Sequence, residues 1–217
     1  MKEFLKVGDT TYILIGTAHV YENSVIEVRE AIRSETPDVV ALELDAARFE
    51  ALLHSEDRRP TIKEMKDFGF KNAFLLLFMS YLQKKISSDA GIMAGREMIE
   101  AATEAKSLGI PIALIDRDLG VTIQKLLENV GLKEKLMILK DAIFPEKGYT
   151  IDYIYENSME LIDEIRERYP FIYEVLVDER DRFMAENLKR IQREKVLAVV
   201  GAGHVPGIKR YLGESYV

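Results

Sequence analysis

Val196-Leu-Ala-Val-Val-Gly201-Ala-Gly-His204-Val-Pro-Gly207-Ile is the stretch that decides the fold, and it lies near the end of a chain of 217 residues. Its first five residues are apolar and mostly β-branched, which is typical of a buried parallel strand. A glycine turn follows, in which His204 lies three residues after Gly201. The stretch therefore predicts a core strand that leads directly into a histidine.

The same arrangement occurs near the other end of the chain, in Tyr12-Ile-Leu-Ile-Gly16-Thr-Ala-His19-Val20. In open α/β sheets, ligands bind beyond the carboxyl ends of the strands. We therefore expect the fold to bring His19 and His204 together at one edge of a sheet. Gly16 and Gly201 would allow a close backbone approach to whatever the imidazoles hold.

Hydrophobic patterning and turn residues predict the other elements. Strands are expected at 2–6, 11–15, 39–44, 110–115 and 196–200, the first two as a hairpin around Gly8-Asp9. Helices are expected from Asn23 or Ser24 toward Pro37, from Asp45 to about His54, over 61–86, from Ser88 or Asp89 to Leu108, and from Ile208. Between Val121 and Glu194 the pattern is helical throughout.

These elements predict an α/β fold with a mostly parallel central sheet and helices on both of its faces. We expect a single domain over residues 1–217, with a helical insertion or cap at about 120–194. Breaks in the insertion are expected around Gly131, 145–148 and Pro170. Such caps often shape a substrate cleft.

Composition excludes several classes of function. The formal net charge of −7, without a Lys/Arg cluster, argues against a nucleic-acid partner. The chain has no cysteine, so a metal must bind histidine, carboxylate or backbone oxygen. Neither a signal peptide nor an apolar run of about 18 residues is recognisable, so the expected location is the cytoplasm or the cytoplasmic face of a membrane.

The segment 73–82 is apolar on nearly all sides of its expected helix. It is too short for a membrane span. Two interpretations remain open: a core helix, or a contact with another subunit or a membrane surface. The second interpretation predicts a homodimer through 73–82.

Three side chains form the candidate metal site. Glu43 ends the strand at 39–44, and a carboxylate buried there needs a partner. With His19 and His204 it makes a two-histidine, one-carboxylate set, which leaves coordination positions for water. A divalent cation there lowers the pKa of bound water to about 7. The alternative is that Arg117 or a backbone turn satisfies Glu43.

Other charged residues carry a functional and a structural interpretation. Asp116, Arg117 and Asp118 follow the strand at 110–115 and either orient an imidazole N–H or form an ion pair and cap the helix at 119. In the run 178–182, an arginine either faces the cleft, to hold a carboxylate or an oxyanion, or belongs to a solvated helix face. Glu97, on the helix ending at Leu108, is either a site residue or an ordinary surface glutamate.

The glycines Gly201, Gly203 and Gly207 do not form a dinucleotide-binding loop. Their spacing is G-x-G-x-x-x-G, and Pro206 occupies the position of the third glycine in that motif. Only ten residues follow Gly207, which leaves no room for the rest of a βαβ unit.

The sequence resembles the TraB/PrgY/GumN family, which includes the Tiki metalloproteases, and looks closest to its archaeal TraB-like branch. The segments that match in order are Gly16-Thr-Ala-His19-Val, Ala41-Leu-Glu43-Leu-Asp, the helix beginning Glu97-Met, Leu114-Ile-Asp116-Arg117-Asp, Asp178-Glu-Arg180-Asp-Arg-Phe-Met-Ala and Val199-Val-Gly201-Ala-Gly-His204-Val-Pro-Gly-Ile. The resemblance implies a fold similar to the erythromycin esterase/ChaN-like α/β fold.

It also implies a metal and catalytic set of His19, Glu43 and His204, with Glu97 and Arg180 as further catalytic candidates. Family members tied to pheromone shutdown imply peptide substrates or peptide sequestration. Many archaeal relatives carry a membrane-spanning C-terminal part, so we expect this chain to be a shortened or naturally short form, with membrane association in a longer one.

The resulting hypothesis is a metal-dependent hydrolase, and among hydrolases a peptidase. Mn²⁺, Co²⁺ or Zn²⁺ would be held by His19, Glu43 and His204, and Glu43 or Glu97 would act as general base. Arg180 would anchor a peptide carboxylate or stabilise the oxyanion. The alternatives are a non-catalytic peptide-binding module of the same fold, and a membrane-associated scaffold acting through 73–82.

Overall fold

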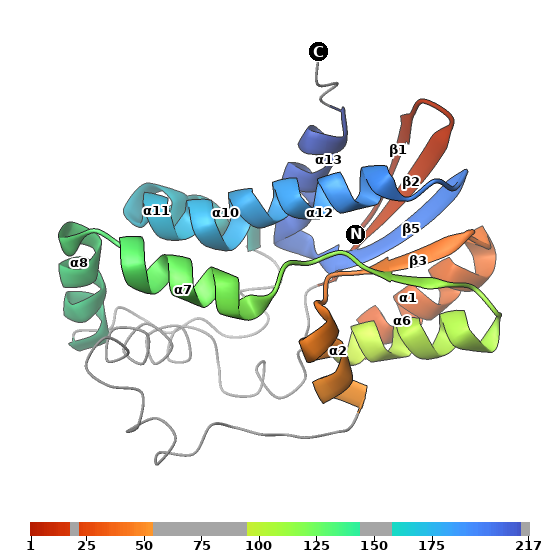
Figure 1. Cartoon of the computed structure of the whole chain (residues 1–217), viewed down its shortest axis with the longest axis horizontal. Coiled ribbons are helices and arrows are strands. Elements are labelled where there is room, and N and C mark those ends of the chain that lie inside the picture. Colours follow the sequence, from red (N-terminus) through yellow and green to blue (C-terminus); the bar gives the residue numbers. More distant parts are fainter. Residues whose placement is uncertain (18–21, 54–94, 144–157, 214–217) are drawn as a thin grey trace.

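The computed structural model describes residues 1–17, 22–53, 95–143 and 158–213 (Figure 1). His19, His54, the expected helix 61–86 with its apolar segment 73–82, and the cap at Ser88 or Asp89 lie outside the described residues. Their predictions therefore stay predictions.

The described strands form one sheet in the order β1-β2-β5-β3-β4. Its members are β1 (Lys2–Val7), β2 (Thr10–Thr17), β3 (Val39–Leu42), β4 (Ile112–Leu114) and β5 (Lys195–Gly201). Strand β1 pairs antiparallel with β2 as the expected hairpin, and the other pairs are parallel. The predicted mostly parallel α/β sheet is confirmed.

The register of β2 and β5 brings the two glycine turns together. Gly16 lies opposite Val200, and Thr17 lies opposite Gly201. The two ends of the chain are therefore neighbours at the carboxyl ends of the central strands, as the repeated pattern predicted.

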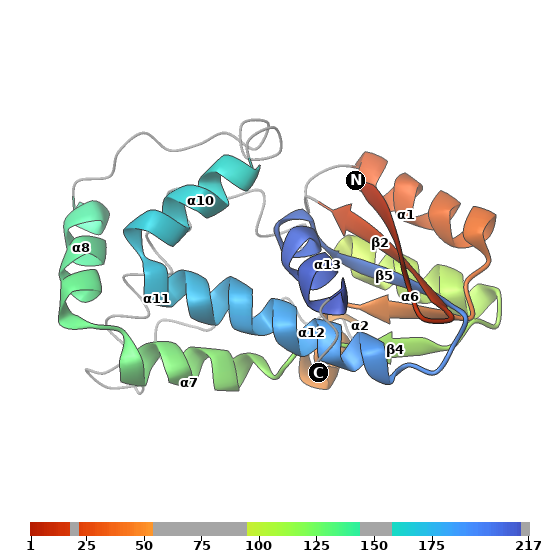
Figure 2. The same ribbon diagram turned by 90° about the horizontal axis from the view of Figure 1, so that it is seen from above.

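Alternating apolar residues send side chains to both faces of the sheet, as the two-residue period of a strand requires. Ile13 and Ile15 of β2 point into one core with helices α1 (Glu22–Glu35) and α6 (Arg96–Ser107). Leu14 points into the opposite core with α12 (Glu179–Arg190) and α13 (Val205–Gly213). Helices therefore cover both faces (Figure 2).

Several helix ends follow local sequence signals. Asp45 caps α2 (Ala46–Leu53) by accepting from the Arg48 backbone N–H at 2.9 Å. Asp118 caps the helix that begins at Leu119 by accepting from the backbone N–H of Gly120 at 2.7 Å. Both agree with the preference for aspartate at helix N-caps.

The helix predicted to start near Asn23 or Ser24 is present as α1, which begins at Glu22. The helix predicted to end at Leu108 needs one correction: Gly95 was expected inside it, but its φ of +98° is not helical, and α6 begins at the next residue, Arg96. The predicted end holds: Gly109, with a φ of +69°, follows the helix.

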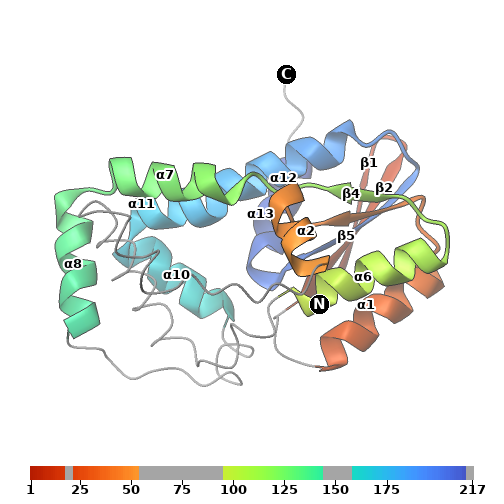
Figure 3. The ribbon, with the colours of Figure 1, turned by 60° about the horizontal axis from the view of Figure 1, so that its bottom comes forward.

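The segment predicted as an insertion is helical wherever the structure describes it. It contains α7 (Leu119–Asn129), α8 (Leu132–Ile143), α10 (Ser158–Arg168), α11 (Pro170–Tyr173) and the π-helix η2 (Glu174–Asp178). Helices α7, α8, α10 and α11 lie to one side of the sheet (Figures 2 and 3).

Helix α12 connects this helical part to the sheet, because Met184, Ala185 and Leu188 belong to the sheet core. The last helix of the predicted insertion is thus also a core helix. Within the described residues, no helix has the length and apolar character needed to cross a membrane.

Candidate functional site

Glu43 lies directly after β3 at the carboxyl-end edge of the sheet, and it is only 6% exposed. Its Oε2 accepts a hydrogen bond of 2.6 Å from the backbone N–H of Gly201, at the end of the neighbouring β5. Its Oε1 accepts a hydrogen bond of 2.5 Å from Nη2 of Arg180. Of the two alternatives considered for Glu43, the backbone turn is therefore correct, through Gly201, whereas the arginine that bonds Glu43 is Arg180 and not Arg117.

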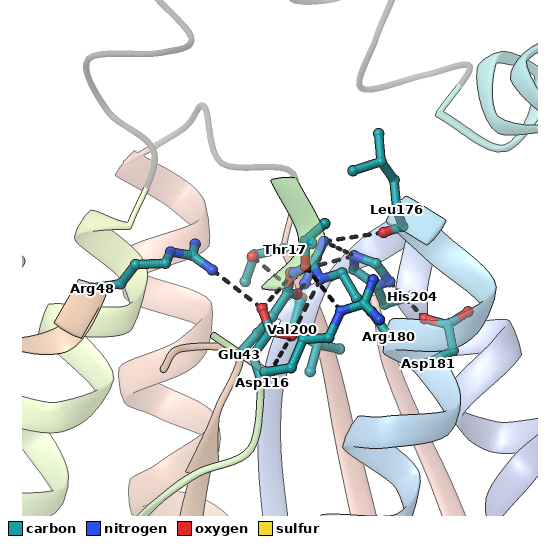
Figure 4. A network of polar contacts seen from close by, with 12 residues as sticks. Thr17, Glu43, Arg48, Asp116, Leu176, Arg180, Asp181, Val200 and His204 are labelled. Carbon is teal, nitrogen blue, oxygen red and sulfur yellow. Dashed lines mark hydrogen bonds and ion pairs between the residues drawn. The ribbon is translucent and has the colours of Figure 1, made fainter. Parts of the chain in front are cut away.

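His204 lies on the short 3₁₀ turn η3 (Ala202–His204) that follows β5. Its Nε2 is 3.3 Å from Oε1 of Glu43. Its Nδ1 is 2.6 Å from Oδ1 of Asp181 on α12. The structure thus brings together Glu43 and one of the two predicted histidines, from strands that are neighbours in the sheet but far apart in sequence (Figure 4).

Arg180 lies at the centre of the network. Its Nε and Nη2 donate to the two oxygens of Asp116, at 3.2 and 2.7 Å. Its Nη1 donates to the carbonyl of Leu176 at 3.2 Å and lies 3.2 Å from Nε2 of His204. Leu176 belongs to the π-helix η2, a kind of turn that occurs frequently at functional sites.

Asp116 follows β4, and its side chain is 2% exposed. Besides Arg180, it accepts from Nη1 of Arg48 at 3.2 Å. Arg48 reaches the network from α2, from the side opposite His204 and Asp181 (Figure 4). One role considered for Asp116 was to orient a histidine side chain, but it bonds Arg180. The carboxylate that contacts Nδ1 of His204 is Asp181.

Burial and charge shift the pKa values of the network in opposite directions. Burial raises the pKa of Glu43, but His204, Arg180 and the Gly201 N–H outweigh it and hold that pKa well below its ordinary value. Burial lowers the pKa of Arg180, but Glu43 and Asp116 raise it above its ordinary value. Both side chains are therefore charged at neutral pH.

The imidazole responds to the same neighbours. Burial lowers the pKa of His204, yet the charge of Glu43 and the hydrogen bonds to Asp181 and Glu43 raise it to about 9, with Arg180 acting in the opposite direction. Burial raises the pKa of Asp181, against the lowering influence of His204. In this arrangement the imidazole is protonated at neutral pH.

Arg117 turns away from Glu43 and His204. Its Nε donates to Thr122 at 2.9 Å, Nη1 to Glu179 at 2.6 Å, and Nη2 to the carbonyl of Val175 at 2.5 Å. Lys125 of α7 also contacts Glu179, at 2.8 Å. Arg117 therefore links the end of β4 to α7, η2 and α12. It is not among the contacts of Glu43 described above.

The two remaining predicted residues, Gly16 and Glu97, are buried. Gly16 allows the two turns to pack closely, because a Cβ there would lie 2.9 Å from Cγ2 of Val205 and 3.1 Å from Cα of Ala202. Glu97 is 2% exposed in the first turn of α6, so it is not the surface glutamate of the structural interpretation. Its role as a base stays a prediction.

Sequence reasoning missed Asp181 and Arg48. Asp181 is 2% exposed, although it lies in a run of five charged residues that reads as a solvated helix face. Its spacing gives one signal, because Asp181 precedes the buried Met184, Ala185 and Leu188 by three, four and seven residues. Arg48 has no comparable signal in its local sequence.

The donor chemistry fits a divalent cation in part. Glu43 and His204 offer a carboxylate and an imidazole at one place, and Asp181 supports the imidazole from behind, as carboxylates do at many metal sites. Within residues 1–17, 22–53, 95–143 and 158–213, no group of three or more His, Cys, Asp or Glu side chains could hold a metal ion. The predicted third ligand, His19, lies outside those ranges.

Comparisons with known proteins point to one family. A model of the TraB/PrgY/gumN family matches residues 4–214. The chain is 40% identical over 221 residues to "Uncharacterized protein MJ1365" of Methanocaldococcus jannaschii, covering 98% of this chain and 56% of that protein.

More distant relatives come from mammals. Proteins named "TraB domain-containing protein" are 27% identical over 240 residues in Homo sapiens and 26% identical over 242 residues in Bos taurus. Each match covers 94% of this chain and 62% of the relative. The chain therefore spans less than two thirds of the length of these curated relatives.

Proposed function

The chain belongs to the TraB/PrgY/gumN family, and we propose that it is a metal-dependent hydrolase that cleaves peptides. The observation that carries the proposal is the approach of His204 Nε2 to Glu43 Oε1, 3.3 Å apart at the carboxyl ends of adjacent parallel strands. This edge is where α/β proteins hold ligands and catalytic groups.

Glu43 and His204 would hold the cation, with His19 as the predicted third ligand. Mn²⁺, Co²⁺ or Zn²⁺ bound there would act as a Lewis acid and lower the pKa of a water molecule. His204 must give up its Nε2 proton to bind a cation, because only the neutral imidazole is a ligand. The Asp181 carboxylate stays on Nδ1 and keeps the ring in place.

Arg180 would act on the substrate. Its guanidinium bonds the same Glu43 oxygen that faces His204, so cation binding to these atoms requires Arg180 to release Glu43. The bonds to Asp116 hold the guanidinium beside the site after that release. From there it can stabilise negative charge on a carbonyl oxygen or bind a peptide carboxylate.

The second carboxylate of the proposed mechanism is Glu97. Whichever of Glu43 and Glu97 is not a ligand would act as the general base. Burial of both side chains favours this use, because exclusion of water strengthens their electrostatic effect on a bound substrate.

The partners proposed for this chain are a peptide, and a second copy of the chain or a membrane surface through 73–82. The working location is the cytoplasm or the cytoplasmic face of a membrane. Gel filtration with light scattering, on the wild type and on Leu76→Asp, tests the dimer. A monomer in both cases removes that part of the proposal.

Peptide hydrolysis tests the main proposal. The purified chain is stripped with a chelator and incubated with a mixture of peptides, with and without added Mn²⁺, Co²⁺ or Zn²⁺. Mass spectrometry is expected to show cleavage only in the presence of a metal. Leu132→Lys, a change at an exposed residue of α8, serves as a control that keeps the cleavage. No metal-dependent cleavage by the wild type would overturn the proposal.

A non-catalytic peptide-binding module is the second candidate. It is favoured by the ion pairs within the network: Arg180 bonds Glu43 and Asp116, and His204 faces Glu43. These carboxylates therefore have charged partners without a bound cation. In that case peptide binding survives the chelator, and no product appears with any metal. The same incubation therefore separates the two candidates.

A further inference from the structure

Gly207, the last glycine of the motif after β5, has ordinary helical backbone angles. Among the described glycines, positive φ angles occur at Gly8, Gly95 and Gly109, whereas Gly207 lies in the regular helix α13. Glycine is a poor residue within a helix. A side-chain reason must therefore explain why this position has no Cβ.

That reason is the carboxyl group of Asp181. A Cβ at Gly207 would lie 2.6 Å from Cγ and 3.0 Å from Cβ of Asp181, and it would collide with Oδ2. The Asp181 side chain approaches α13 from the neighbouring α12. Only glycine at position 207 leaves the volume that this carboxylate occupies.

The other oxygen of the same carboxylate faces the imidazole. Oδ1 of Asp181 is 2.6 Å from Nδ1 of His204, and the Asp181 side chain is 2% exposed. With a proton on Nδ1, the ring donates to Asp181 and turns Nε2 toward Glu43. Gly207 and Asp181 together thus decide where the reactive nitrogen of His204 points.

We propose that Asp181 and Gly207 form a positioning pair for His204, in which the glycine makes room for the carboxylate that fixes the orientation of the imidazole. The last glycine of the motif after β5, Gly207, is then explained by the orientation of His204. The inference deepens the proposed function, because fixing Nε2 matters for cation binding. Its structural part, the bond to Nδ1, stands without any metal.

Unfolding measurements test the contact itself. Gly207→Ala is expected to lower the melting temperature, and Asp181→Ala is expected to remove that effect by vacating the same volume. Gly213→Ala, in the same helix but with open space around its Cβ, is the matched control and is expected to cost nothing. Equal losses from Gly207→Ala with and without Asp181 would overturn the proposed contact.

The proton on Nδ1 tests the positioning. In metal-free wild type, NMR is expected to show a His204 Nδ1 proton that exchanges slowly with water, assigned with His19→Gln and His54→Gln. Asp181→Ala and Gly207→Ala are expected to lose it. Asp178→Ala, at the last residue of η2, breaks a different contact with α13, to Arg210 and Tyr211, and is expected to keep the signal. A signal that persists in Asp181→Ala, or is absent from the wild type, would overturn the proposal.

Manganese affinity connects the pair to the proposed function. Asp181→Ala is expected to weaken Mn²⁺ binding by about 10- to 100-fold, the usual effect of removing a carboxylate behind a histidine ligand. Asp178→Ala is expected to leave it unchanged. If the wild type binds none of Mn²⁺, Co²⁺ and Zn²⁺, the proposed function fails while the NMR result still decides the positioning. If the wild type binds Mn²⁺ and Asp181→Ala binds it equally, the positioning fails alone.

Discussion

Two sets of ion pairs join distant parts of this chain, and they differ in their surroundings. Between α1 and α6, Arg29 contacts Glu100 and Arg33 contacts Glu104, in pairs whose arginines are exposed although the Glu104 side chain is only 6% exposed. At the sheet edge, Arg180 contacts Glu43 and Asp116. The Arg33 side chain is 61% exposed, whereas that of Arg180 is 16% exposed.

The difference separates a structural use of charge from a functional one. Exposed pairs cost little to form and contribute about 0–1 kcal/mol. Buried charges lose their hydration, and well-packed apolar residues of similar size often stabilise a protein as well or better. A contribution to folding stability is therefore enough to account for the α1–α6 pairs. It does not account for the buried network around Glu43, which indicates a chemical role for that network.

The largest expected effect is on the proposed reaction. Glu43→Gln removes the charge of a cation ligand or base and is expected to lower kcat for peptide cleavage by about 10²- to 10⁴-fold. Glu104→Gln, in the α1–α6 set, is the matched control and is expected to leave kcat unchanged. Kinetics at saturating Mn²⁺ measure both. Equal rates for Glu43→Gln and wild type would show that the two sets do not differ in function.

The next effect is on folding stability. Arg180→Met leaves Glu43 and Asp116 buried with fewer partners, and breaking a buried pair in this way costs about 3–5 kcal/mol. Arg33→Met removes an exposed guanidinium from Glu104, which keeps Arg29 at 3.8 Å, and is therefore expected to cost about 1 kcal/mol. Urea unfolding of the two variants measures the difference. Similar losses in both would mean that burial does not distinguish the two sets.

A smaller effect is the dependence of stability on pH. The folded pKa of His204, about 9, lies above its ordinary value of 6.5, so the stabilisation is fully present below pH 6.5 and is lost as the pH rises through 9. At 1.36 kcal/mol for each pH unit, this difference corresponds to about 3 kcal/mol.

Urea unfolding of metal-free protein between pH 6 and 9.5 measures this loss. His204→Gln is expected to flatten the decline, whereas Arg33→Met is expected to keep it. A wild-type stability that stays constant across this range would contradict the assigned charge of His204.

The sequence predicted the fold well because its signals were local. Runs of apolar residues gave all five described strands, and Asp45, Asp118 and Gly109 marked helix ends. The repeated turns at Gly16 and Gly201 correctly predicted neighbouring strands, because parallel strands in one sheet end at the same edge. Gly95 was the main error, since its positive φ excludes it from the helix that periodicity extends through this position.

Only those site residues that directly follow a strand could be predicted from the sequence. Glu43 and His204 follow strands, so their meeting could be foreseen, and the family resemblance added Arg180. The spacing of Asp181 to the buried residues of α12 indicates that it faces the core, but its contact with His204 depends on how α12 packs against α13 and follows from no local pattern. Arg48 reaches Asp116 through tertiary packing that no local pattern encodes.

The central claim is that Glu43 and His204 serve one cation. Crystals of the chain grown with Mn²⁺, with diffraction measured for anomalous scattering, test it most directly. We expect an anomalous peak within about 2.3 Å of Nε2 of His204 and of the Glu43 carboxylate, with Arg180 released from Glu43. No peak at these atoms, with the Arg180 guanidinium still bonded to Glu43 at high Mn²⁺ concentration, would contradict the account.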